Sequence, residues 1–219
     1  ILKRNFSEVV TRAQGIWWSM GESHIDPVAE PAFRPLLKQF QDIGTFALEL
    51  DRAPAAEIAV LVDDESYYYE SINNDLDVPL IFQQRLWGLP RLGAPADYYL
   101  LNDFLDGKLP PYKLYIILNP WHLDDSRRAA LDRELHHDNR VALWIYAPGY
   151  IKEKPDLSHM EELTGFRFGK GEHMWGPMIN ILDFEHPITQ ALPEDFSWGT
   201  NSRLGPVFHL EDVEARILG

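Results

Sequence analysis

Three uninterrupted apolar runs, separated by segments of other texture, constrain the fold of this chain more than any other feature. They are EIAVLVD (57–63), YKLYIILNP (112–120) and RVALWIYAPGY (140–150). Such a run is typical of a strand that is buried on both faces, as the strands of a parallel sheet are. Because antiparallel strands usually alternate apolar and polar residues, these runs favour a parallel sheet covered on both sides.

The segments around these runs complete the pattern of alternating strands and helices. Helices are predicted over 78–93, 124–139 and 157–165, and short strands over 96–103, 177–183 and 205–212. In the helix over 157–165, we expect Ser158 to be the N-terminal cap and Gly165 to end the helix. The repeated order of strand and helix predicts an α/β fold with right-handed crossovers. The expected fold class is a flavodoxin-like open parallel sheet with helices on both faces.

The first part of the chain has a different organisation. Apolar residues recur at helical spacing on one face over 27–50, with Asp26 as a plausible cap and Pro27 at the first helical position. The segment 51–57, DRAPAAE, reads as a linker. This predicts a boundary that divides residues 1–55 from a second domain, 56–219.

Composition and charge exclude several classes of function. Acidic residues outnumber basic ones by 34 to 20, so the net charge is −14. This argues against nucleic acid and against an anionic membrane surface as partners. The chain has no cysteine, which removes disulfides and thiolate chemistry and fits a cytoplasmic location. No apolar run approaches the roughly 20 residues of a membrane span.

Polar and aromatic residues follow the predicted strands, where open α/β sheets bind ligands. Asp63 and Asp64 follow the first long strand, Trp121 follows the second and Tyr150 ends the third. An acidic and aromatic crevice suits a sugar or a cation. The alternative is that the acids cap the turns that follow the strands.

The same strand ends offer little for other chemistry. The loop DDESYYYES (63–71) has no glycine, which argues against a nucleotide or flavin. The turn APGY (147–150) has no serine or cysteine where an acyl-enzyme nucleophile would lie. The eight histidines show no metal-binding spacing. We therefore expect no cofactor and no metal.

The tryptophan pair in GIWWSMGESH (15–24) raises a separate question. Trp17 and Trp18 lie close to Glu22, and indole faces stack on the apolar face of a sugar ring. These three residues are therefore candidate substrate-binding residues. Ordinary burial of large aromatic side chains explains the pair equally well.

Several ordered segments resemble a known family of glycoside hydrolases. They include GAPADYYLLNDFLDGKLPPYKLYIILNPWHL (93–123), VALWIYAPGYI (141–151) and ELTGF (162–166). Over residues 56–219 the chain resembles the amidotransferase-like domain that follows the catalytic barrel in family 42 β-galactosidases. RNFSEVVTRAQGIWWSM (4–20) resembles the end of that (β/α)8 barrel, with GIWWSM as its eighth strand and 27–50 as its last helix.

The resemblance implies a role without catalysis for this chain. In the family, the two catalytic glutamates lie on the fourth and seventh barrel strands, which have no counterpart here, so no catalytic residue is assigned. The amidotransferase-like domain of the family mediates oligomer contacts, which implies a homo-oligomer. A carbohydrate substrate would be bound through the barrel of the parent enzyme.

Three functions are therefore expected in order of preference. The first is the C-terminal portion of a β-galactosidase-like glycoside hydrolase, inactive by itself, with an accessory or oligomerisation domain. The second is a stand-alone α/β module that binds a small ligand, such as a sugar, in the crevice. The third is an independent hydrolase that uses Glu22 and an acid of the crevice.

Overall fold

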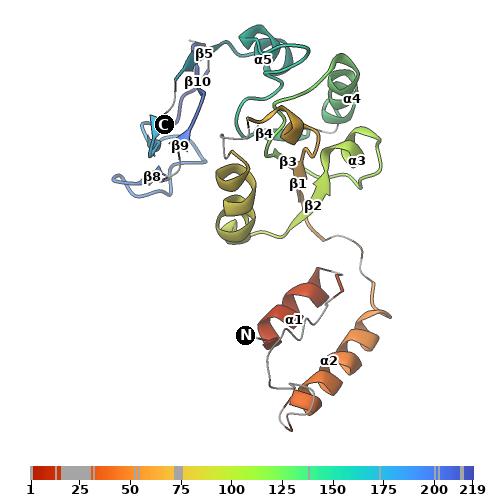
Figure 1. Ribbon diagram of the computed structural model, residues 1–219. Coiled ribbons are helices and arrows are strands. Elements are labelled where there is room, and N and C mark those ends of the chain that lie inside the picture. Colours follow the sequence, from red (N-terminus) through yellow and green to blue (C-terminus); the bar gives the residue numbers. More distant parts are fainter. Residues whose placement is uncertain are drawn as a thin grey trace. The chain divides into compact units, whose positions relative to one another are not determined.

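The chain forms two compact units, Ile1–Pro54 and Ala55–Gly219, which are described separately. A computed structural model describes residues 2–12, 14–15, 31, 33–51, 53, 55–71, 76–137, 139–172, 174–199, 201, 203–212 and 215–219. Figure 1 shows the elements in chain order. No helix among the described residues is long and apolar enough to cross a membrane.

The first unit contains two helices, α1 (Leu2–Thr11) and α2 (Phe33–Ala47). The rings of Phe6 and Phe40 are buried and stack with their centroids 4.2 Å apart, which joins the two helices. Helix α2 lies within the predicted helix 27–50, whereas α1 was not predicted. The expected barrel strand GIWWSM (15–20) lies almost entirely outside the described residues.

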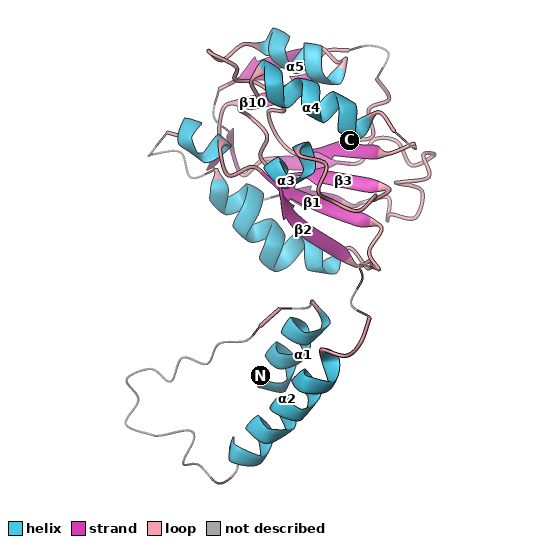
Figure 2. Ribbon diagram, turned by 90° about the vertical axis from the view of Figure 1, so that its right-hand side faces the viewer, coloured by secondary structure: helices cyan, strands magenta, loops and turns pink. Residues whose placement is uncertain are grey.

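The second unit is built on a parallel sheet of four strands, which confirms the predicted fold class. The strands are β1 (Ile58–Val62), β2 (Ala96–Leu100), β3 (Leu114–Ile117) and β4 (Val141–Trp144). Their order across the sheet is β2-β1-β3-β4, and each neighbouring pair is parallel. Figure 2 shows these strands side by side.

Helices cover both faces of the sheet, as the apolar runs predict. On one face, α3 (Leu101–Leu105) and α4 (Asp125–Leu135) pack on Ala59, Leu61 and Ile117, with Leu163 of α5 (Leu157–Thr164) beside them. On the other face lie three helical segments, of which the first supplies Leu80 and Ile81 and the third supplies Leu89 against Val60 and Ile116. These segments are η2 (Val78–Phe82) and η3 (Gln84–Gly88), both π-helical, and η4 (Leu89–Arg91).

Two local predictions in this unit were wrong. The strand predicted over 96–103 ends at Leu100, and α3 begins at the next residue. Helix α5 is capped by Asp156 and not by Ser158, because the Asp156 carboxylate accepts a hydrogen bond from the Ser158 backbone N–H. Gly165 ends this helix with a φ of 77°, as predicted.

Short antiparallel pairs form the last part of the unit. β5 (Phe168–Gly171) pairs with β10 (Val207–Leu210), β6 (Met174–Trp175) with β9 (Arg203–Leu204), and β7 (Met178–Asn180) with β8 (Ser197–Gly199). The predicted strands over 177–183 and 205–212 correspond to β7 and β10.

Candidate functional site

The strand order places the point where the topology reverses between β1 and β3. The chain crosses from β1 to β2 on one side of β1 and then to β3 on its other side. In open α/β sheets the carboxyl ends of such strands are the usual place for a ligand. The residues that follow β1 and β3 therefore decide whether a ligand site exists there.

Asp63, the first residue after β1, is completely buried in this position. Its carboxylate accepts hydrogen bonds from both terminal nitrogens of Arg127, Nη2 at 2.5 Å and Nη1 at 3.3 Å. The Ser66 hydroxyl donates to its second oxygen. Arg127 belongs to α4 and is itself buried. Asp63 is thus bound within the protein, and its carboxylate does not line an open crevice.

Asn119, which follows β3, joins the two strand ends at the backbone. Its side-chain oxygen accepts from the Asp63 N–H at 2.7 Å, and its amide donates to the Asp63 carbonyl at 2.6 Å. Because a buried polar group must be hydrogen-bonded to avoid a large cost, this reciprocal pair holds β1 and β3 in register at their ends. The point of reversal is therefore a buried, hydrogen-bonded polar core, in which Nε of Arg127 has no hydrogen-bond partner among the described residues.

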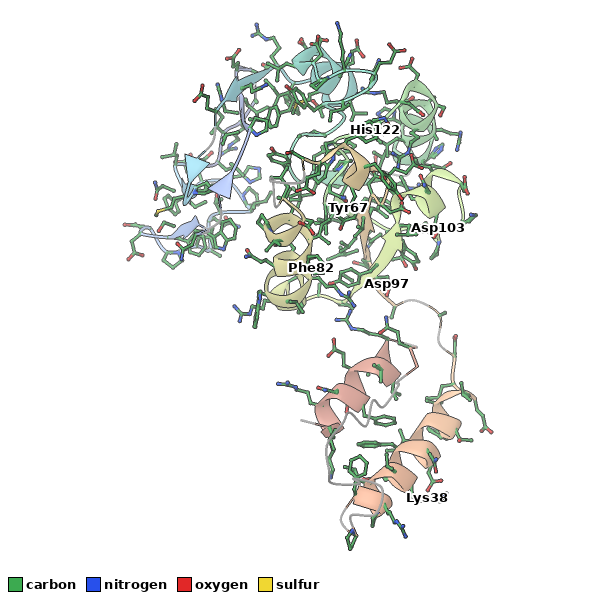
Figure 3. All side chains as sticks on the ribbon, in the orientation of Figure 1. Lys38, Tyr67, Phe82, Asp97, Asp103 and His122 are labelled. Atoms are coloured by element: carbon green, nitrogen blue, oxygen red, sulfur yellow. The ribbon has the colours of Figure 1, made fainter. Side chains whose placement is uncertain are left out.

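His122 lies beside this polar core (labelled in Figure 3) and is 8% exposed. Its ring stacks on Tyr69 with centroids 3.7 Å apart and an angle of 11° between the planes. Nδ1 of His122 is buried without a hydrogen-bond partner in the described part of the chain. Burial, and next the positive charge of Arg127, lower the pKa of His122 below its usual range. The ring is therefore neutral at pH 7.

The candidate crevice residues divide between two environments. Asp63 lies in the buried polar core, and Asp64 is exposed. Trp121 and Tyr150 line the same pocket of about 200 Å³, from which both acids are absent. The pocket is formed by Tyr69, Glu70, Ser71, Leu76, Trp121, Tyr146, Ala147, Tyr150, Ile151, Pro206 and Phe208.

The backbone after β4 turns sharply at the edge of this pocket. Tyr146 and Ala147 have φ angles of 57° and 42°, in the left-handed region that residues with a side chain rarely adopt. The Tyr146 hydroxyl donates to the Pro206 carbonyl at 2.7 Å, which fixes the ring in place. The turn carries no serine or cysteine.

Sequence reasoning missed much of this arrangement. Arg127 and Asn119 gave no signal as partners of Asp63, since they lie more than 50 positions away in the chain. Tyr146 and Phe208 also escaped notice, although the aromatic residues of 146–150 and 208 follow predicted strands. No group of three or more possible metal ligands occurs among the described residues. Trp17, Trp18 and Glu22 lie outside the described residues.

Comparisons with solved structures show that the fold is similar to part of a glycoside hydrolase. No protein-family model matches the chain, and no curated protein matches it. Gan42B, a GH42 β-galactosidase, is similar in structure over 84% of this chain and 26% of its own, with 14% identity and a TM-score of 0.52. The chain therefore spans about a quarter of that enzyme.

Two further structures are similar to a lesser degree. A catalytic mutant of Gan42B from G. stearothermophilus covers 86% of this chain and 27% of its own, at 13% identity and a TM-score of 0.49. A β-galactosidase from Bifidobacterium adolescentis covers 53% of this chain and 63% of its own, at 17% identity and a TM-score of 0.39. Of the three, the first Gan42B structure, with its TM-score of 0.52, is the one that supports a shared fold.

Proposed function

We propose that this chain is one part of a β-galactosidase-like glycoside hydrolase, and that residues 56–219 serve it as a non-catalytic accessory domain. The observation that carries the proposal is the likeness of fold to part of a GH42 β-galactosidase over 84% of the chain. The segments 93–123 and 141–151 support it, because they resemble the amidotransferase-like domain of that family.

The chemistry of the strand ends supports a role without catalysis. The Asp63 carboxylate is fully buried and held by Arg127, so it is not available to a substrate. The turn after β4 has no serine or cysteine nucleophile over residues 146–149. Glycoside hydrolysis needs two carboxyl groups on either side of a bound sugar. Neither Asp63 nor this turn meets that need.

Hydrolysis of p-nitrophenyl β-D-galactopyranoside tests the proposal. The 219-residue chain alone should release no nitrophenol above the buffer rate, and the polypeptide purified from the natural source should hydrolyse the substrate. Turnover by the chain alone, abolished in Glu22→Gln, would establish instead the independent hydrolase that the sequence also allowed.

The proposal extends to assembly, because the resemblance implies oligomer contacts through the accessory domain. Light scattering of the purified chain measures its oligomeric state directly. We expect a particle mass of at least two copies of the 25.3 kDa chain. A monomer at concentrations above about 100 μM, where even the weaker specific interfaces form, would remove assembly from the proposed role.

The pocket at Trp121 and Tyr150 favours a second candidate function, a module that binds a small ligand. The class of ligand that this pocket suits follows from the side chains and charges that line it.

A further inference from the structure

The walls of the 200 Å³ pocket are unusually rich in aromatic rings. Five of its eleven residues are aromatic, and they come from the segments that follow β1, β3 and β4 and from β10: Tyr69, Trp121, Tyr146, Tyr150 and Phe208. Neighbouring rings meet at steep angles, 85° between Trp121 and Tyr146 and 69° between Tyr146 and Phe208. Rings at such angles present surfaces to an enclosed ligand from several directions.

Most of the polar atoms on these walls are already hydrogen-bonded within the protein. Trp121 Nε1 donates to the Ser66 carbonyl, and the Tyr146 hydroxyl donates to Pro206. The Tyr150 hydroxyl accepts from Lys170 Nζ at 3.0 Å. A sugar, which carries a hydroxyl on almost every carbon, needs many free polar groups in its site. These walls offer ring surface in their place.

Glu70 lines the pocket and accepts a hydrogen bond from the Leu76 backbone N–H, and Lys170 lies beside the pocket. The Glu70 carboxylate belongs to the lining, and after burial and Tyr150 it contributes to raising the pKa of Tyr146. Lys170 Nζ lies 5.5 Å from the centroid of the Tyr150 ring, on the side of the hydroxyl to which it donates. Lys170 is not part of the lining but faces Phe208 across the β5–β10 pair. The net charge of −14 also favours the approach of cations.

The backbone also points to a purpose beyond packing. Tyr146 and Ala147, both in the lining, hold consecutive left-handed φ angles. Conformations of this kind are costly for residues with a side chain and gather at ligand sites. The strained turn brings Tyr146 to the wall of the pocket.

We propose that this pocket binds a small organic cation of the quaternary ammonium class. Ring faces at steep angles stabilise such a cation through cation–π attraction, and a nearby carboxylate offsets its charge. The volume of about 200 Å³ suits one trimethylammonium group and is below the usual size of a site for a larger ligand. The inference is independent of the glycoside hydrolase proposal and stands on the pocket alone.

Isothermal calorimetry on the full 219-residue chain with three probes tests the proposal. Choline and 3,3-dimethylbutan-1-ol have the same shape and differ in charge, and D-galactose represents the sugar class. Choline should bind, and its neutral counterpart should bind about tenfold more weakly, as cation–π attraction predicts. Equal affinity of the two isosteres, binding of galactose alone, or no heat from any probe would each overturn the proposal.

Matched variants place the binding at this pocket. Tyr69→Leu and Glu70→Gln should each weaken choline binding by about fivefold or more. Tyr68→Leu is the control, because Tyr68 is 86% exposed and absent from the lining. Thermal unfolding of each variant separates loss of a contact from loss of the fold.

Lys170→Met gives a result that a merely apolar or sugar site would not produce. Removing the lysine takes a positive charge away from Tyr150 and should strengthen choline binding, with no effect on the neutral isostere. Unchanged or weaker choline binding in Lys170→Met would contradict the proposal.

Discussion

Arg127 connects parts of the α/β unit that are distant in sequence. Beyond its bond to Asp63, its guanidinium donates to the His122 carbonyl at 3.0 Å and to Asn102 Oδ1 at 3.1 Å. These partners follow β1, β3 and β2, so one side chain from α4 ties three strand ends together. Arg127 Nη1 also lies 3.6 Å from a carboxylate oxygen of Glu65. Because Asp63 is fully buried, the loss of Arg127 leaves the Asp63 carboxylate without its counter-charge.

The first prediction concerns this ion pair. Arg127→Met should lower the free energy of unfolding by about 3–5 kcal/mol, because it leaves the Asp63 carboxylate buried without a counter-charge. Urea denaturation measures the change. Lys113→Met is the matched control, since Lys113 and Glu57 form an exposed pair worth less than about 1 kcal/mol.

A double variant separates the ion pair from simple packing. Asp63→Leu combined with Arg127→Met should recover much of the lost stability, because two apolar groups replace the two charges. If the double variant lost as much stability as Asp63→Leu and Arg127→Met lose together, the two charges would not depend on each other.

The second prediction concerns pH and His122. Its pKa is lowered in the folded state, so the unfolded chain takes up a proton at a higher pH than the folded chain does. The contribution of His122 to stability is therefore complete above the unfolded pKa of about 6.5 and is lost as the pH falls below it. His122→Phe should keep the stack on Tyr69 and unfold with a weaker pH dependence.

Urea denaturation at pH 7.5 and pH 5.5 measures this difference. The exposed His137 is the control position, and His137→Phe should leave the pH dependence as it is in the wild type. An identical pH dependence in His122→Phe and the wild type would contradict the assignment.

At the scale of the elements, the turn after β4 is constrained at Gly149 by its backbone and by its neighbours. Gly149 has a φ of 64°, and a Cβ atom there would lie 2.6 Å from Arg128 Nη2 and 2.9 Å from Leu163 Cδ2. Gly165, which ends α5, also has a positive φ but meets nothing within 4 Å. The two glycines thus differ in the space around them and share the same backbone requirement.

The third prediction uses this pair. Gly165→Ala should cost about 1 kcal/mol from the left-handed backbone alone. Gly149→Ala should cost about 2–4 kcal/mol, because crowding against α4 and α5 is added to the same backbone cost. The shift in the urea midpoint measures both, and equal losses would show that Gly149 is not crowded.

The elements also show how far the sequence predicts this molecule. Continuous apolar runs predicted β1 and β3, because a strand buried on both faces needs apolar residues at every position. The run 140–150 predicted the strand β4 but not its exposure, because β4 lies at the edge of the sheet and Val141 and Leu143 are exposed. The boundary at Leu100 was missed, because the local preferences of YYLLND (98–103) suit either a strand or a helix. The packing of α3 in the core decides between the two. The polar core was not predicted either, because Asp63 meets Arg127 only once the strand order is known.

At the scale of the whole molecule, the sheet and its site lie in the unit Ala55–Gly219, while α1 and α2 form the unit Ile1–Pro54. That residues 1–55 are the end of a catalytic barrel stays a prediction, as do the roles of Trp17, Trp18 and Glu22. The chain spans about a quarter of the length of the GH42 β-galactosidase that it is similar to, so activity on a galactoside stays a proposal.

The intact mass of the denatured polypeptide from its natural source tests most directly the claim that this chain is one part of a larger hydrolase. We expect a mass above 25.3 kDa by at least that of a (β/α)8 barrel, which takes about 250 residues. A mass of 25.3 kDa would contradict the claim and would make the ligand pocket the first candidate for the function of the protein.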